Sequence, residues 1–211
     1  MDAFVRLTSR VAPLLRDNVD TDAIIPASYM RSLATDPASG LFARWRLRTD
    51  GSPDPAFVLN DQRYRGARIL LAGANFGCGS SRENAVWALA GGGYRCVIAR
   101  SFSDIFTQNA LQNGVLPLVL DAADHARLAA AAISTTPVQA TIDVAARQVE
   151  WTGAEPVAFP LDDRQQDRLL RGLDPIAETL REESRIERFR AAQRERAPWL
   201  GAPVERDESR S

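Results

Sequence analysis

The middle of the chain, residues 67–93, reads ARILLAGANFGCGSSRENAVWALAGGG. The apolar run at 67–72 is short and bounded by glycine on both sides, which is the pattern of a buried strand. After a glycine-rich turn, Ser80 and Glu83 have the S-x-x-E form of a capping box, in which the serine hydroxyl accepts a hydrogen bond from a first-turn amide. We therefore expect a helix that starts there and ends at the three glycines 91–93, because glycine easily takes the left-handed conformation that ends helices.

The same alternation continues toward the C-terminus. A second apolar run occupies 96–99, a helical pattern follows at 103–113, and a third apolar run occupies 115–120. Strands that alternate with helices imply a parallel sheet, because the crossover helix returns the chain to the same edge. The sequence thus predicts an α/β fold in which these three strands are central, the sheet is largely parallel and helices cover its faces.

The flanking segments are less regular. Trp45 is the expected aromatic anchor of a long excursion without regular structure between residues 35 and 55. We predict one domain over residues 1–180, followed by a charged helical tail at 181–211 that is partly disordered. The further expected elements are a helix from Asp121 to about Ile133, a hairpin of 140–144 and 148–151, and helices at 162–172 and 174–194.

Composition excludes several classes of protein. The 211 residues are 45% hydrophobic and 25% charged, which is ordinary for a soluble globular domain. The formal net charge is −1, so no overall field favours nucleic acid or anionic lipid. The N-terminus lacks the apolar run of a signal peptide, and no stretch of about 18 apolar residues follows. We expect a cytoplasmic protein that binds neither nucleic acid nor membrane.

Cysteine and histidine are too scarce for a metal centre. The chain has Cys78, Cys96 and one histidine, His125, which cannot ligate a four-iron cluster or a structural zinc ion alone. We expect packing roles for both cysteines and an exposed position for His125, which lies in a polar helical stretch. Any metal chemistry has to come from a partner, and this chain is predicted to bind no cofactor and no metal.

Residues 75–83, NFGCGSSRE, place glycines, two hydroxyls and an arginine between a strand and a helix N-terminus. First-turn amides and the helix dipole attract an anion there, and arginine can hold a carboxylate with two parallel bonds. The spacing and the missing lysine argue against a phosphate loop, and the G-x-S-x-G pattern of a hydrolase elbow is absent. A nucleophilic Cys78 would lack a base. The purely structural alternative is that Ser80 caps the helix and Arg82 faces solvent.

Several motifs of the chain resemble those of a known family. Residues 75–83 resemble the signature of the small subunits of 3-isopropylmalate dehydratase and of the matching swivel domain of aconitases. Residues 18–26, NVDTDAIIP, resemble the family's N-terminal motif, and 101–106 and 113–117 match in the expected order. The similarity covers about residues 4–180. It implies the aconitase-type swivelling β/β/α domain.

The resemblance also implies roles for particular residues. Ser80 would be the base that removes a proton from a substrate carbon, Arg82 would bind a substrate carboxylate, and Asp22 would belong to the active-site network. A serine can act as a base only where its alkoxide is stabilised, which the helix N-terminus and Arg82 would do. The implied substrate-binding residues are Gly79 and Ser81 beside them, and Tyr29, Met30 and Arg31 in the loop that adapts the site to the substrate's side group.

The implied reaction interconverts 2-isopropylmalate and 3-isopropylmalate through isopropylmaleate, in leucine biosynthesis. The implied partner is a large subunit, in a heterodimer or larger assembly, whose [4Fe-4S] cluster takes the substrate hydroxyl as a Lewis acid. This chain would supply the other face of the site and be inactive alone.

Two positions depart from the family pattern. Asn84 stands where the family commonly has histidine, so this position cannot titrate, and Val86 replaces a proline that would preset the first helical turn. Both put the substrate in doubt. A paralogous hydro-lyase acting on methylmalate, citraconate or dimethylmalate is one alternative, and a non-catalytic anion-binding or assembly module is another. The sequence does not identify the large subunit or the oligomer.

Overall fold

The structure is a computed structural model that describes residues 1–30 and 36–200. It divides into two compact units, Met1–Leu173 and a second that begins at Asp174. In the described part of the first unit, seven strands form one sheet in the order β4-β3-β2-β1-β5-β6-β7. The strands are β1 (Arg6–Leu14), β2 (Ile69–Ala72), β3 (Cys96–Ala99), β4 (Leu116–Val119), β5 (Gln139–Asp143), β6 (Gln148–Trp151) and β7 (Val157–Ala158).

Strand β1 joins two kinds of sheet. Its C-terminal half pairs in parallel with β2, from Val11 opposite Ile69 onward, and its N-terminal half pairs antiparallel with β5, with Arg6 opposite Asp143. Burial follows this division, because the first half alternates between exposed and buried residues while the last four residues are all buried. This is the usual difference between the two kinds of sheet, since parallel strands are covered on both faces and antiparallel strands often have one face in solvent.

The prediction of a largely parallel sheet is confirmed for β4-β3-β2-β1, whose pairs are all parallel. The prediction that the strand at 115–120 is central was wrong, since β4 lies at the edge of the sheet. The strand in the middle is β1, a position that the sequence did not predict. The hairpin is confirmed as β5 and β6, and β7 extends it.

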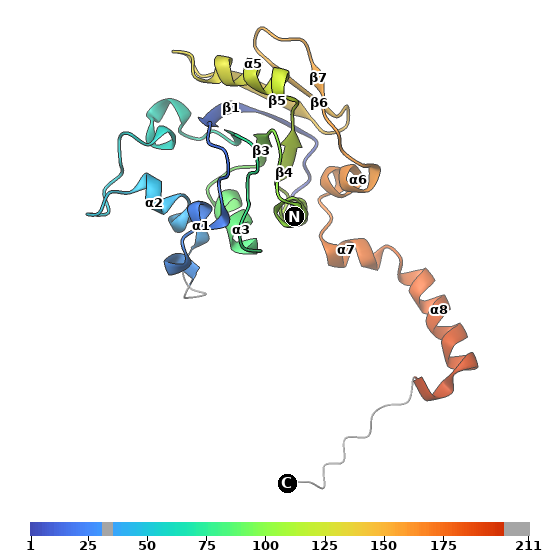
Figure 1. Ribbon diagram of the computed structural model, residues 1–211. Helices are drawn as coiled ribbons and strands as arrows, with labels where there is room; N and C mark the ends of the chain where they lie inside the picture. The colour runs from blue at the N-terminus through green and yellow to red at the C-terminus, as the bar shows by residue number, and fades with distance from the viewer. Residues whose placement is uncertain (31–35, 201–211) are drawn as a thin grey trace, which may run out of the picture. The chain divides into compact units, whose positions relative to one another are not determined.

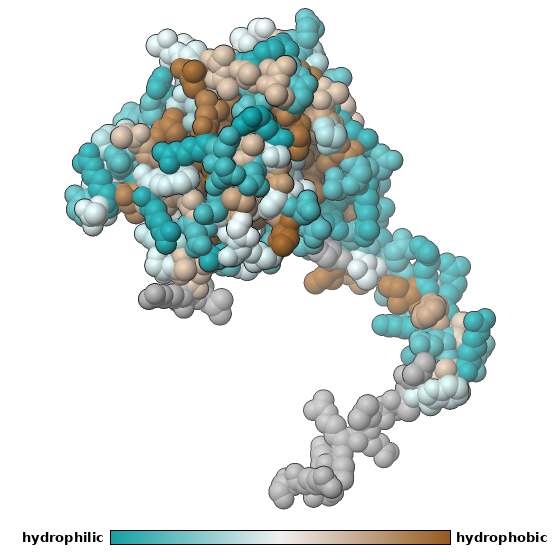
Figure 2. All heavy atoms as spheres, in the orientation of Figure 1, coloured by the Kyte–Doolittle hydropathy of each residue, from teal (hydrophilic) through white to brown (hydrophobic). Residues whose placement is uncertain are grey.

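Helices cover the sheet on both faces, as expected (Figure 1). Successive side chains of β2 point to opposite faces of the sheet, so Leu70 and Ala72 belong to one buried cluster while Ile69 and Leu71 belong to the other. The first cluster contains residues of α3 (Glu83–Gly91) and α4 (Asp104–Gln112), and the second contains residues of α5 (Ala122–Ala132) and α6 (Asp163–Arg171). The viewed face is mostly hydrophilic, with hydrophobic residues in smaller groups (Figure 2).

The region expected to lack regular structure contains single helical turns. Trp45 stacks on Phe42 with ring centroids 6.0 Å apart, and Arg16 lies over its ring at 4.5 Å, so the expected aromatic anchor is present. The short helices are α1 (Thr21–Ile24), α2 (Ala43–Arg46) and the 3-10 turns η1 (Ala27–Met30), η2 (Pro37–Gly40), η3 (Val58–Asn60) and η4 (Gln62–Tyr64).

The second unit contains α7 (Pro175–Leu180), α8 (Glu183–Arg196) and the turn η5 (Pro198–Leu200). The single helix predicted at 174–194 is therefore two helices. The sequence predicts the domain boundary after residue 180, where α7 ends, and we keep that boundary as a proposal. The expected disorder of the tail's last residues, 201–211, lies outside the described residues.

Candidate active site

Helix α3 does not begin as the sequence predicts. It starts at Glu83, Arg82 is its N-cap, and no side chain caps it, so the expected capping box of Ser80 and Glu83 was wrong. Ser80 lies two residues before the N-cap, in a loop where its carbonyl accepts a hydrogen bond from the Thr21 hydroxyl at 3.0 Å. Ser80 is thus outside the helix, and the residue is exposed.

The two quoted motifs, residues 18–26 and 75–83, lie against each other. Asp20 and Cys78 form a parallel bridge, in which the Thr21 amide donates to the Cys78 carbonyl at 2.9 Å. Asp20 also caps α1, because its Oδ1 accepts from the Ala23 amide at 2.7 Å. The N-terminal motif is therefore a capped turn that supports the glycine-rich loop.

Arg82 and Asp22 form an ion pair across the two motifs. Their side chains are 23% and 40% exposed, so the pair lies at the surface with the guanidinium half-buried. Asp22 holds one Nη of Arg82, and a guanidinium has five N–H donors, so others remain for a second acceptor. The expected neighbourhood of Asp22 and Arg82 is thus present.

A cleft of about 230 Å³ opens beside this pair. Ser80 and Gly79 lie on one wall, and residues of α4 form another. Ser103, the N-cap of α4, donates its hydroxyl to the Gly77 carbonyl at 2.6 Å and thereby joins the two walls. The cleft is lined by Thr21, Gly77, Gly79, Ser80, Arg82, Ser103, Asp104, Ile105, Phe106 and Asn109.

Glycine is required at the base of the cleft. Gly77 has φ of 73°, and a Cβ placed there would lie 2.3 Å from Cγ of Phe106. Gly79 has φ of 88°, but a Cβ there would come no nearer than 3.4 Å to Asp20. The positive φ favours glycine at both positions, and close packing on Phe106 adds a second reason at Gly77 only.

The predicted substrate-binding residues are not all gathered here. Ser81 is exposed beside Ser80 but does not line the cleft. Tyr29 and Met30 pack against the first buried cluster and are absent from the lining. Arg31 lies outside the described residues. Their roles in binding stay predictions.

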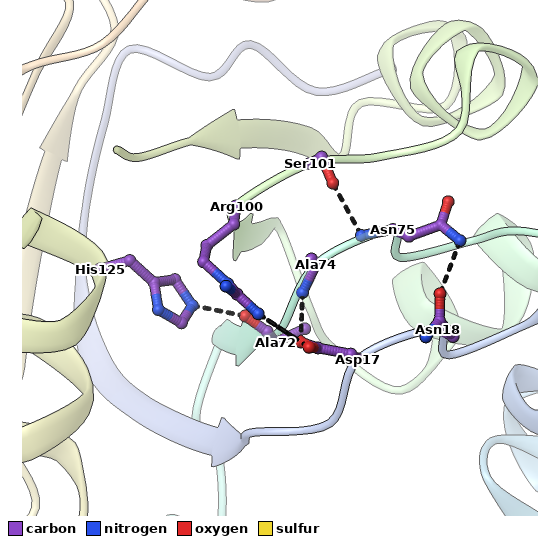
Figure 3. Close-up of polar contacts among 8 residues, drawn as sticks. All are labelled: Asp17, Asn18, Ala72, Ala74, Asn75, Arg100, Ser101 and His125. Carbon is purple, nitrogen blue, oxygen red and sulfur yellow. Dashed lines mark hydrogen bonds and ion pairs between the residues drawn. The ribbon is translucent and has the colours of Figure 1, made fainter. Parts of the chain in front are cut away.

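The cleft rests on cross-links between the loops that follow β1, β2 and β3 (Figure 3). Asp17 is the centre of one, where its carboxylate accepts from the Ala74 amide at 2.7 Å and from Arg100 Nη2 at 2.8 Å. The bond from Arg100, followed by the one from Ala74, lowers the pKa of Asp17. A Cβ on Gly73 would lie 2.1 Å from Oδ1 of Asp17, so this packing also requires glycine.

A second set of cross-links lies next to the first in Figure 3. Asn75 donates its side-chain amide to Oδ1 of Asn18 and its backbone amide to the Ser101 hydroxyl, each at 2.8 Å. Both asparagines have positive φ, 54° for Asn18 and 57° for Asn75, a conformation that asparagine tolerates better than most residues. These bonds fix the direction in which the chain enters the loop of Ser80.

His125 belongs to the same scaffold. It is only 7% exposed, and its Nε2 lies 2.6 Å from the Ala72 carbonyl at the end of β2. The expectation that it is exposed was wrong, because α5 packs its His125 face onto the sheet. A buried imidazole with a backbone partner is a structural residue here.

The residues that sequence reasoning missed come mainly from the segment after β3. Ser103, Ile105 and Asn109 all line the cleft, although the sequence offers 101–106 only as a family resemblance. A usable signal existed, because ligands of parallel sheets bind at the carboxyl ends of adjacent strands, and β3 is the neighbour of β2.

Known proteins share the sequence that builds this site. Residues 1–123 match the family model described as the aconitase C-terminal domain. The chain belongs to this family. Within it, the 3-isopropylmalate dehydratase small subunit of Cupriavidus necator is 48% identical over 206 residues, covering 95% of this chain and 98% of that protein. The small subunit of Brucella canis is 44% identical over 200 residues, covering 94% and 100%.

A solved structure agrees with the assignment to the aconitase C-terminal domain family. The crystal structure of a 3-isopropylmalate dehydratase from Methanocaldococcus jannaschii matches with a TM-score of 0.60 and 28% identity, covering 88% of this chain and 99% of that one. The swivel-type fold expected from the resemblance is confirmed.

The cysteines of this aconitase C-terminal domain do not suit an iron-sulfur cluster. Cys96 is buried within β3, and burial raises the pKa of its thiol well above the usual range. Burial and the nearby charge of Asp20 also raise the pKa of Cys78, which argues against an activated nucleophile. Across residues 1–30 and 36–200, no group of three or more His, Cys, Asp or Glu side chains is placed to hold a metal ion. In the same residues no helix is long and apolar enough to cross a membrane.

Proposed function

We propose that this chain is the small subunit of a 3-isopropylmalate dehydratase, a hydro-lyase that interconverts 2-isopropylmalate and 3-isopropylmalate through isopropylmaleate. Relatives that carry this name are 44% and 48% identical over nearly the whole chain. One observation carries the proposal further: Ser80 and Arg82 line one cleft, and Asp22 from the other motif holds Arg82. An assembly module would need none of this chemistry.

Ser80 has the position of a base in this proposal. Its hydroxyl is exposed to the cleft while its carbonyl is fixed by Thr21, so the side chain can reach a substrate without freeing the backbone. A proton would pass from a substrate carbon to the Ser80 oxygen. The alkoxide form needs positive potential, which Arg82 and the N-terminus of the nine-residue helix α3 supply.

Arg82 would bind a carboxylate of the substrate. Asp22 takes one Nη, so the guanidinium is already oriented and keeps donors for a planar carboxylate. Orientation before binding reduces the entropy that the complex loses. In this scheme Asp22 is a positioning residue and Gly79 and Ser81 contribute polar groups beside the carboxylate.

The iron-sulfur cluster belongs to the large subunit in this proposal. When bound there, a [4Fe-4S] cluster supplies Lewis-acid chemistry toward the substrate hydroxyl. This chain contributes the base and a carboxylate-binding side chain, and we propose that it acts only in complex with that subunit. A cytoplasmic location and the absence of nucleic-acid and membrane partners stay predictions.

The substitutions noted in the sequence do not remove this chemistry. Val86 is fully buried in the first cluster, where its side chain packs as part of the core beneath α3. Asn84 is half-buried at the second position of α3. Neither lines the cleft, so the isopropyl-bearing substrate remains the proposal and methylmalate, citraconate or dimethylmalate are the alternatives.

An assay of the anaerobically assembled enzyme tests the function. We expect this chain with its own large subunit to hydrate isopropylmaleate, and the chain alone to show no turnover. Preference for methylmalate or dimethylmalate over isopropylmalate would move the assignment to the paralogous hydro-lyase. Formation of the complex without turnover of any of these dicarboxylates would point to the non-catalytic module.

A further inference from the structure

The two walls of the cleft differ in chemistry. The wall of Ser80 and Arg82 is polar and carries the guanidinium. The wall of α4 presents the carboxylate of Asp104 at the start of the helix, then Ile105, whose surface is 48% exposed, and one helical turn later Asn109. Residues four apart lie on the same face of a helix, so Ile105 and Asn109 are neighbours on that wall.

The buried core does not require an isoleucine at position 105, where about half of the residue is exposed. The next residue, Phe106, already fills the core, since it is 2% exposed and its ring packs on Gly77. Ile105 is therefore not part of the buried core, and about half of its surface is exposed in the cleft that Arg82 also lines. A ligand with an alkyl branch and a carboxylate would match both walls at once.

In the loop expected to sense the side group, the structure describes Tyr29 and Met30, and these two residues do not supply this surface. Tyr29 and Met30 do not line the cleft, and both pack against the first buried cluster. Tyr29 is further confined because a Cβ on Gly40 would lie 2.7 Å from its own Cβ. Among the described residues that line the cleft, Ile105 is the large apolar side chain that is also exposed.

We propose that Ile105 is a specificity-determining residue that contacts the alkyl branch of the dicarboxylate whose carboxylate Arg82 binds. This inference rests on the proposed function and deepens it. An isopropyl branch is two carbons larger than a methyl branch, and hydrophobic pockets discriminate about tenfold or more for each carbon. The side chain at position 105 should therefore set the ratio between branched and unbranched substrates.

The test compares Ile105→Val and Ile105→Ala with wild type in the assembled enzyme. We expect the ratio of kcat/KM for isopropylmalate to that for methylmalate to fall by about tenfold in Ile105→Ala and by less in Ile105→Val. The control is Ile133→Ala, which removes an isoleucine that is 61% exposed at the C-cap of α5 and does not line the cleft. That variant should keep the wild-type ratio.

Association with the large subunit is measured in parallel by titration of the two chains. If Ile105→Ala lowers kcat/KM for every dicarboxylate by the same factor, or weakens association without changing the ratio, Ile105 is a subunit contact and the inference is wrong. Failure of the proposed function is seen separately in wild type, as a lack of preference for isopropylmalate. In that case the effect of Ile105→Ala is measured on the ratio of kcat/KM for the two dicarboxylates that the wild-type enzyme accepts best.

Discussion

The residues in and around the cleft fall into two groups, those available for the reaction and those that hold the structure. The hydroxyl of Ser80 has no structural use within the described residues, whereas its backbone carbonyl is bonded to Thr21. Arg82 and Asp22 are each partly exposed and joined. Farther from the cleft, Asp17 and Arg100 have bonds only within the scaffold. Substitutions in the two groups should therefore affect different measurements.

Ser80→Ala should abolish turnover and leave stability unchanged. Removal of a general base costs about 10²- to 10⁴-fold in rate. Because Ser80 does not cap α3, the free energy of unfolding should change by no more than about 0.5 kcal/mol, as for other surface positions. Steady-state kinetics of the assembled enzyme and urea unfolding of this chain provide the two measurements. Ser134→Ala, at an exposed serine that does not line the cleft and donates to the Thr136 carbonyl, is the control for turnover, and near-normal kcat in Ser80→Ala would exclude the base.

Asp17 should make stability sensitive to acid. Its pKa is lowered, chiefly by the bond from Arg100, so its contribution is fully present above the unfolded carboxyl pKa of about 3.9 and is lost as pH falls through the lower folded value. Asp17→Asn should therefore flatten the dependence of the urea midpoint on pH below about pH 4. Arg100→Gln should flatten it as well, and the double variant should add little. A wild-type slope in Asp17→Asn would show that the bond is unimportant in solution.

At the scale of elements, the loop between β2 and α3 is shaped by what it packs against. Gly77 is pressed onto Phe106 of α4, Thr21 of α1 holds the carbonyl of Ser80, and Asn75 is tied to Ser101 after β3. Three elements thus fix one loop, which suits a site that must present a side chain at a defined position.

Gly77→Ala should destabilise the chain more than an equally strained glycine elsewhere. The left-handed backbone costs about 1–2 kcal/mol for alanine, and the contact with Phe106 adds about 1–3 kcal/mol of overpacking. Gly66 is the matched control, since its φ is 76° but a Cβ there would meet nothing within 4 Å. Gly66→Ala should lose only the first contribution. Equal losses in urea unfolding would mean that α4 yields to the added methyl group.

Local signals predicted the elements well and their order poorly. Short apolar runs and capping residues located β2, β3, β4 and α4 because burial and capping act within a few residues. The place of β1 depends on pairing with β5, over a hundred residues away, so no local pattern reveals it. Position 80 shows the same limit in the site. Its capping signal was misleading because α3 begins only after Arg82, in a loop whose backbone Thr21 contacts only in the folded chain.

At the scale of the molecule, one unit holds the core. Within the described residues, every buried apolar side chain lies between Phe4 and Leu169, in the unit Met1–Leu173. In the second unit large apolar residues remain exposed: Ile176 at 72%, Leu180 at 59%, Phe189 at 68% and Trp199 at 73%. Figure 2 shows brown spheres at the surface of this unit.

A chain that ends at Leu173 should keep its fold. Since the buried apolar residues all lie before this point, thermal unfolding of the shortened chain should be cooperative, with a midpoint within about 2 °C of the full chain. Circular dichroism of the two chains side by side provides the measurement. A midpoint lower by about 10 °C would show that the residues after 173 stabilise the first unit.

The double pairing of β1 also has a consequence for synthesis. This strand is made well before its antiparallel partner, since Arg6 lies opposite Asp143. Ribosomes add about 5 to 20 residues each second, so the N-terminal half of β1 must wait on the order of 10 s for β5. The parallel half finds β2 much sooner, because Val11 pairs with Ile69. A nascent chain therefore exposes an unpaired strand edge for several seconds, when binding by a chaperone would prevent aggregation.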